Sequence, residues 1–439
     1  MRPRARLASL REIAAVVAAL AAASSPRAVS ALPLYARQTG EPCASCHTAF
    51  PELTPFGRRF KLGGYTLGGG KSNLPPFAVM LQPTFTHTAA GQPQGAAPHF
   101  GPNDNLAVQQ ASLFSGGRIT DNVGAFIQAT YDSAARRFGW DNTDIRFSES
   151  GNIAGHSLLW GLSLNNNPTV QDVWNTTPAW RFPYISSELA PQPVASTLIE
   201  GPLAQRTLGL GAYGFLDDSF YAELSAYRDL SKSAQTALGV DTTGESPVDG
   251  AAPYWRVAFE RDFGKHSLEF GTFGLKANLV PLRMPGAGTD AVTDIGVDTQ
   301  YQFIAGRQAV TLRASWIDES HDLAASRALG LADNSRDKLR SLRASASYTF
   351  GDTWSLTAGR FVLAGTPDAA LYGTSSGSPN SSGWVLEAAY LPFMHGGPSF
   401  WPWFNARVGL QYTVYNKFDG ATRGAGDNNT LFLYTWIMF

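Results

Sequence analysis

Most of the chain alternates between apolar and polar residues with a period of two. In one such segment Val123, Ala125, Ile127, Ala129 and Tyr131 occupy every second position. Because side chains at every second position of a β-strand point to the same face, each segment predicts a strand with one apolar face. The pattern predicts about sixteen strands, over residues 79–85, 106–119, 123–131, 143–149, 158–164, 203–216, 220–230, 253–263, 266–279, 295–305, 310–317, 339–350, 354–363, 384–394, 404–415 and 431–439.

The spacing of these segments predicts a closed barrel. Tight turns such as Phe350-Gly351-Asp352 alternate with longer loops rich in Gly, Ser and Asp, such as 364–382. Bacterial outer-membrane barrels have an even number of antiparallel strands, short periplasmic turns and longer outer loops. We therefore expect an all-β fold, a transmembrane antiparallel β-barrel of about 16 strands over residues 77–439. A soluble β-sandwich is the alternative.

Composition and the C-terminus agree with a barrel. Charged residues make up 16% of the chain, below the ~25% usual in soluble domains, whereas 44 glycines and 12% aromatic residues are high. The mean hydropathy of −0.13 is too polar for a bundle of membrane-spanning helices. Phe439 ends an alternating segment, which resembles the signal read by outer-membrane assembly machinery. The net charge of −1 excludes a bulk attraction to nucleic acid.

The N-terminus has the pattern of a secretory signal peptide. Arg2, Arg4, Arg6 and Arg11 are followed by an alanine-rich apolar run, and small residues at 29–31 suit cleavage. The alternative, a transmembrane anchor, needs an apolar run about twice as long. We expect residues 1–31 to be removed on export, so that the mature protein reaches the bacterial outer membrane.

Both cysteines of the chain lie in the motif Cys43-Ala44-Ser45-Cys46-His47. This spacing is typical of covalent haem c attachment, in which two thiols hold the haem and the histidine is an axial iron ligand. A redox-active dithiol is the alternative, but it predicts a βαβ context that is absent here. Residues 32–76 are too few to bury a haem alone. We expect them to form a plug segment in the wide barrel lumen, inserted from the periplasmic side.

Several blocks resemble one known family. They are Leu32-Pro-Leu-Tyr-Ala-Arg-Gln-Thr-Gly40, the haem motif, 50–57, 60–65, and, in the early barrel, 165–172 and 174–180. Together they resemble the fused outer-membrane monohaem cytochrome–porin family of iron-oxidising bacteria. The resemblance implies one covalent haem c in an N-terminal plug, a sixteen-strand porin, and oxidation of extracellular Fe(II).

The resemblance also implies roles for residues around the motif. Cys43 and Cys46 would hold the haem, and His47 would be its proximal ligand. Other candidate haem contacts are basic or aromatic: Arg37, Arg58, Arg59 and Lys61 for the propionates, and Phe50, Phe56, Phe60 and Tyr65 for covering the ring. Glu52 is a candidate to tune the haem, with a surface carboxylate as the alternative. Met80 or His87 is the candidate sixth ligand, and Met would give the higher potential.

These observations predict an electron conduit from an extracellular donor, Fe(II) first, through one haem to a periplasmic c-type cytochrome. The protein would then act as an extracellular Fe(II) oxidase embedded in outer-membrane lipid. No cluster of carboxylates and histidines has metal-ligand spacing, so the sequence predicts no stable iron-substrate site. Two alternatives stay open: a solute porin that its haem plug gates, and an electron-uptake conduit for other donors.

Overall fold

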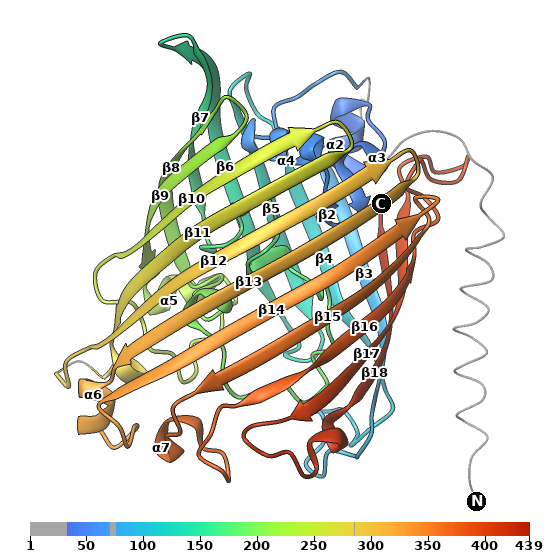
Figure 1. Ribbon diagram of the computed structural model, residues 1–439. Helices are drawn as coiled ribbons and strands as arrows, with labels where there is room; N and C mark the ends of the chain where they lie inside the picture. Colours follow the sequence, from blue (N-terminus) through green and yellow to red (C-terminus); the bar gives the residue numbers. More distant parts are fainter. Residues whose placement is uncertain (1–32, 71–75, 285) are drawn as a thin grey trace, which may run out of the picture.

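Sixteen antiparallel strands close into one barrel in the computed structural model, which describes residues 33–70, 76–284 and 286–439 (Figure 1). The predicted signal peptide and Leu32 lie outside the described residues. The barrel strands are β3 Phe77–Thr88, β4 Asn105–Arg118, β5 Val123–Asp132, β6 Arg137–Ile153, β7 His156–Asn165, β8 Thr207–Leu216, β9 Phe220–Asp229, β10 Ala252–Phe263, β11 His266–Leu279, β12 Asp290–Ala305, β13 Gln308–Asp322, β14 Arg336–Phe350, β15 Trp354–Gly365, β16 Ser381–Tyr390, β17 Asn405–Lys417 and β18 Thr430–Met438. Strand β18 pairs with β3 and closes the barrel.

The predicted number of strands is confirmed, and most boundaries lie within a few residues. Strand β11 has the predicted bounds, whereas β12 begins at Asp290 because its early residues pair along the full length of β11. Strand β6 differs most, because it begins at Arg137, six residues before its predicted start. Residues 203–206 and 391–394, which the pattern predicts as strand, lie in the β7–β8 and β16–β17 connections.

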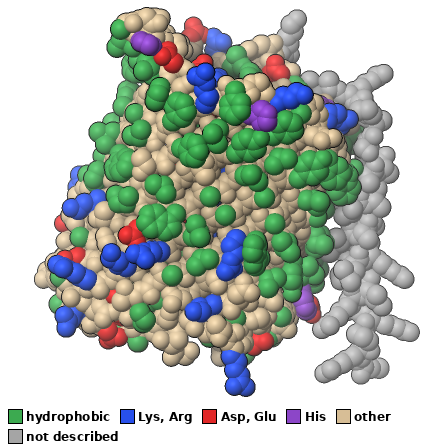
Figure 2. Space-filling model, viewed as in Figure 1, with side chains coloured by type: hydrophobic (Ala, Val, Ile, Leu, Met, Phe, Trp, Pro, Cys, Tyr) green, Lys and Arg blue, Asp and Glu red, His purple; other side chains and the backbone are tan. Residues whose placement is uncertain are grey.

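The barrel has the polarity of a membrane protein, with apolar residues outside and charged residues inside. On β9, Leu224 is 65% exposed while its neighbour Glu223 is 6% exposed. On β10, Val257 is 52% exposed while Arg256 is fully buried. Figure 2 shows apolar side chains over much of the outer face, densest in its upper half, with charged side chains along the upper rim and over the lower half. A soluble sandwich would bury the apolar face, so this closed barrel is an outer-membrane barrel.

Turns and loops alternate along the chain as predicted. At one end of the barrel, which we call the turn end, most connections are short, as at 264–265, 306–307 and 351–353, and 391–404 is the long exception. At the other, the loop end, lie 230–251 with α5 Lys232–Ala237, 323–335 with α6 Ala324–Ala328, and 366–380 with α7 Ala369–Tyr372. None of the described helices is long and apolar enough to cross a membrane.

Two segments fill the lumen. The first, which we call the plug, consists of α2 Pro33–Thr39, α3 Cys43–Cys46, β1 His47–Ala49, β2 Glu52–Leu53 and α4 Pro55–Leu62, and lies near the turn end (Figure 1). Thr54 caps α4 by accepting a hydrogen bond from the Gly57 amide, and Pro55 begins the helix. The second, the inner loop, comprises residues 166–206 between β7 and β8, and most of its first half is buried.

The sequence pattern does not predict the inner loop. The blocks 165–172 and 174–180, which resemble the early barrel of the family, lie largely within it. Its polar residues satisfy one another: Asp172 accepts hydrogen bonds from the amides of Trp174, Thr176 and Thr177. The loop returns to its start, where the Gln205 amide donates to the Asn166 carbonyl at 2.8 Å. These bonds pair backbone groups of the loop, so it can lie inside the lumen. Gln171 Oε1, Asn175 Oδ1 and Arg181 Nε are nevertheless buried without a hydrogen-bond partner among the described residues.

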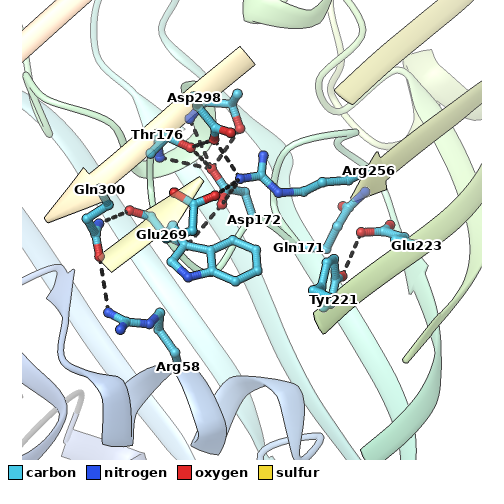
Figure 3. A network of polar contacts seen from close by, with 12 residues as sticks. Arg58, Gln171, Asp172, Thr176, Tyr221, Glu223, Arg256, Glu269, Asp298 and Gln300 are labelled. Carbon is cyan, nitrogen blue, oxygen red and sulfur yellow. Dashed lines mark hydrogen bonds and ion pairs between the residues drawn. The ribbon is translucent and has the colours of Figure 1, made fainter. Parts of the chain in front are cut away.

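One polar network joins the plug, the inner loop and the wall (Figure 3). Arg58 of the plug makes a bidentate contact with Glu260 of β10, at 2.9 and 3.0 Å. Glu260 also accepts from the indole N–H of Trp174, whose ring lies 4.9 Å from the Arg256 guanidinium. Breaking one partner of a buried ion pair leaves an uncompensated charge and costs about 3–5 kcal/mol. The network therefore fixes the plug and the inner loop against the same side of the barrel.

We expect removal of the plug alone to open the lumen only in part. Deleting residues 33–70 leaves the inner loop in place, so single-channel conductance in planar bilayers should rise modestly. Joining Asn167 to Ala204 through a short Gly-Ser linker in the same variant should raise it further, because the loop ends are adjacent. Heat-modifiable migration on gels checks that each barrel has assembled. Equal conductance in the two deletion variants would contradict the position of the inner loop.

Candidate functional site

A cavity of about 350 Å³ lies inside the barrel, where the plug, the inner loop and strands β3 to β6 and β18 meet. The plug, the wall and the inner loop each contribute to its lining. Its lining includes Cys46, His47, Phe50, Lys61, Tyr65, Met80, Asp141, Tyr184, Glu188 and Trp436. The cavity thus brings together residues from the first eighty positions of the chain and from its last strand.

The two cysteines occupy α3, a single turn of helix that follows Pro42. Cys46 lines the cavity, whereas Cys43 is fully buried and its Sγ accepts a hydrogen bond from Asn405 Nδ2 at 3.0 Å. Burial raises the pKa of Cys43 well above its usual value, and burial together with Glu41 raises the pKa of Cys46 to about 12. Thiol exchange needs a thiolate, so this environment disfavours a redox-active dithiol.

His47 begins β1 and lines the cavity beside Cys46. Its ring packs edge to face on Phe50, with centroids 5.2 Å apart, and its Nδ1 is buried without a hydrogen-bond partner among the described residues. Burial lowers the pKa of His47 to about 4, against the opposing effect of the Pro51 and Glu52 carbonyl groups. The imidazole is therefore neutral at neutral pH, which is the form that ligates a metal.

Of the two candidate sixth ligands, the structure brings only Met80 to the cavity. Met80 points inward from β3, is 2% exposed, and its Sδ accepts from Gln82 Nε2 at 3.5 Å. His87 lies on the opposite face of the same strand and its Nδ1 bonds Asp104 at 2.6 Å. Positions 80 and 87 differ by an odd number, so the period of two places them on opposite faces.

Some of the aromatic candidates line the cavity and one does not. Phe50 and Tyr65 line the cavity, and the Tyr65 ring stacks on Tyr35 at 5.4 Å. The Tyr65 hydroxyl donates to Asp144 of β6 at 2.7 Å, which ties the plug to the wall. Phe56, in contrast, is 40% exposed and is absent from the described cavity lining, because it lies on the outer face of α4. The predicted haem contact of Phe56 is therefore not supported.

Of the four basic candidates for haem contacts, three do not line the cavity. Arg58 donates hydrogen bonds to Glu260 and Gln302, and Arg37 donates to the Phe77 carbonyl. Neither is among the described residues lining the cavity, because each extends to the barrel wall instead. Arg59 is half-exposed and pairs with Asp218 and Asp262.

Lys61 is the plug cation that does line the cavity. It donates to the Val170 carbonyl of the inner loop. Burial, together with the nearby Arg146 charge, lowers the pKa of Lys61 to about 8. A negatively charged group in the cavity would therefore stabilise the charged ammonium.

Glu52 is a structural anchor and not a surface carboxylate. It is 1% exposed and accepts from Thr48, from the Tyr184 hydroxyl at 2.6 Å and from Arg313 at 3.0 Å. Although burial raises the pKa of Glu52, Arg313 and the hydrogen bonds lower it below its usual value. The carboxylate therefore stays charged and holds the β1–β2 turn, beside His47, to the inner loop and to β13. Sequence reasoning missed Tyr184 and Arg313 because their partners lie far away along the chain.

No protein-family model and no curated protein matches the chain. Among solved structures, OmpF of Salmonella typhi in complex with daunomycin is 12% identical, with a TM-score of 0.48, covering 83% of this chain and 97% of that one. The outer membrane channel DcaP of Acinetobacter baumannii is 13% identical, with a TM-score of 0.45 and coverage of 85% and 100%. The anion-selective porin from Comamonas acidovorans is 11% identical, with a TM-score of 0.45 and coverage of 82% and 98%. At these identities the chain is similar to them in fold alone.

Proposed function

We propose that this outer-membrane barrel carries electrons from an extracellular donor, Fe(II), through one covalent haem c to a periplasmic c-type cytochrome. One observation carries the proposal. Cys46 and His47 of the attachment motif line the same cavity as Met80, and this cavity lies within the lumen. Covalent attachment, an axial histidine and a thioether are the groups that a c-type haem uses.

Each residue has a role in this proposal. Cys43 and Cys46 would hold the haem through thioether links, and His47 and Met80 would be the groups that ligate its iron. The haem supplies one-electron oxidation and reduction of its iron when it is bound. Phe50, Tyr65 and Trp436 exclude water from it, and a drier, more apolar surrounding favours the less charged, reduced iron. Lys61 is the cation best placed to meet a propionate.

The position of the cavity supports transfer across the membrane. The hydrocarbon layer is about 30 Å thick, so one haem can serve both sides only from within the lumen. Short turns face the periplasm in bacterial barrels. The plug at the turn end would then meet the cytochrome acceptor, and the loop end would face the donor.

The cavity has two acidic side chains against one cation, Lys61, which suits a cationic donor. Asp141 and Glu188 line it, and Gln110 donates to Glu188 at 3.1 Å. No group of three or more metal-ligating residues exists within the described residues, so Fe(II) would meet the site in passing and would not be stored there. Burial and the nearby Asp132 charge raise the pKa of Glu188 to about 7.

The central test uses sealed vesicles that contain the holoprotein. Fe(II) added outside should reduce the haem, and an oxidised cytochrome c enclosed inside should reoxidise it. The change is followed by absorbance. Haem reduction that occurs only after the vesicles are broken would overturn the conduit. Reduction by an organic donor with Fe(II) inert would keep the conduit and replace the donor.

Replacement of Cys46 by Ala, or of His47 by Ala, should abolish the normal haem site while the barrel still assembles. Strand pairing closes the barrel, whereas the motif lies in an added plug segment. Covalent haem is checked by peroxidase staining and assembly by heat-modifiable migration. Met80→Leu is the matched control from the same cavity, and it should keep the covalent haem. Loss of barrel assembly in Cys46→Ala would make the haem a folding element.

Glu188 predicts a pH dependence for reduction by Fe(II). Below a pH of about 7 the carboxyl is protonated, so the cavity loses one negative charge and attracts the cation less. The initial rate of haem reduction should therefore rise between pH 6 and pH 8 in the wild type, to an extent of a few-fold. In Glu188→Gln the same rise should be smaller, and an unchanged profile would remove Glu188 from the donor path.

A further inference from the structure

A second pocket lies on the far side of the inner loop from the cavity that Cys46 and His47 line, which we call the haem cavity. It has a volume of about 200 Å³ and is enclosed by residues 178–193 of the inner loop and by strands β14 to β18. We call it the outer pocket. Pro183 and Ser186 line both the outer pocket and the haem cavity, so a single stretch of chain separates the two spaces.

The charge of the outer pocket is positive. Among the described residues that line it, the charged ones are Arg181 of the inner loop and Arg343 of β14. Both guanidinium groups share one carboxylate, Glu200, at 3.5 and 2.7 Å. Two positive charges therefore face a single negative charge, which leaves a net charge of +1 at this wall of the lumen.

Arg181 retains an unpaired donor for a further anion. Arg181 Nε is buried and has no hydrogen-bond partner among the described residues. Burial and the neighbouring Arg343 lower the pKa of Arg181 to about 9, and a bound negative charge would oppose that effect. The hydroxyl groups of Ser186 and Thr413 line the same pocket and can donate as well.

We propose that the outer pocket binds a small multivalent oxyanion, of the carboxylate or phosphate class, between Arg181 and Arg343. Guanidinium groups match these anions because their N–H donors form a planar fork. The size agrees, since about 200 Å³ is below the roughly 300–1,000 Å³ of pockets for drug-sized ligands. The site concerns binding and stands whether or not the barrel conducts electrons.

The site has a consequence for the haem, which rests on the proposed function. An anion bound in the outer pocket lies one chain thickness from the haem cavity, across Pro183 and Ser186. Negative charge near a redox centre stabilises its more positive, oxidised state. The midpoint potential of the haem should therefore fall when the outer pocket is filled.

The test is calorimetric titration of the holoprotein in detergent with citrate and, separately, with phosphate. The wild type should bind at least one of them, and Arg181→Gln or Arg343→Gln should weaken binding about tenfold or more. The matched control is Arg360→Gln. Arg360 lies on the neighbouring strand β15, but it points outward and donates to the Gly383 carbonyl at 2.7 Å, so its loss should leave binding unchanged.

A variant that is expected to strengthen anion binding keeps the test decisive if an arginine variant assembles poorly. Glu200→Gln removes the carboxylate that competes for both guanidinium groups, so it should tighten binding. Absence of binding in the wild type, or equal binding in Arg343→Gln and the wild type, would overturn the site. Binding without a change of midpoint potential would keep the site and overturn its coupling to the haem. Failure of Fe(II) to reduce the haem would bear on the conduit alone.

Discussion

The constraint on which the structure depends is that no backbone N–H or C=O group can be left unpaired in hydrocarbon. Sixteen strands satisfy it by pairing in a closed ring, with β18 against β3. Closure places alternate side chains in lipid and in the lumen, so the polar half of every strand becomes the interior. The interior of this protein is therefore largely polar, with apolar patches such as that around Met80, Phe114 and Trp436, and further chain with matching side chains fills it.

The plug and the inner loop are that further chain, and buried charge pairs hold them. Arg58 pairs with Glu260, and Glu52 pairs with Arg313 and Tyr184. Such pairs contribute less to net stability than apolar packing would, but they specify one arrangement, since the loss of either partner leaves a buried charge. The segment 43–47 is thus positioned by contacts that come from distant parts of the chain.

The same arrangement divides the lumen into two spaces of different charge. The cavity next to His47 contains Asp141 and Glu188, whereas the outer pocket contains Arg181 and Arg343. A single stretch of the inner loop separates them. The barrel can therefore present different surfaces to cations and to anions.

The sequence by itself determined the all-β barrel, its sixteen strands and the alternation of turns and loops, because a period of two and a turn signal are local properties. It also placed Cys43, Cys46 and His47 in one short motif with the spacing of haem c attachment. The period of two along β3 also means that Met80 and His87 face opposite sides, and the structure shows that Met80 is the one that faces the lumen. Only the tertiary structure decided that Arg58 and Arg37 bind the wall, that Phe56 faces away, and that residues 166–206 fill the lumen. These outcomes depend on partners such as Glu260 and Arg313, which lie hundreds of positions away and which no local pattern identifies.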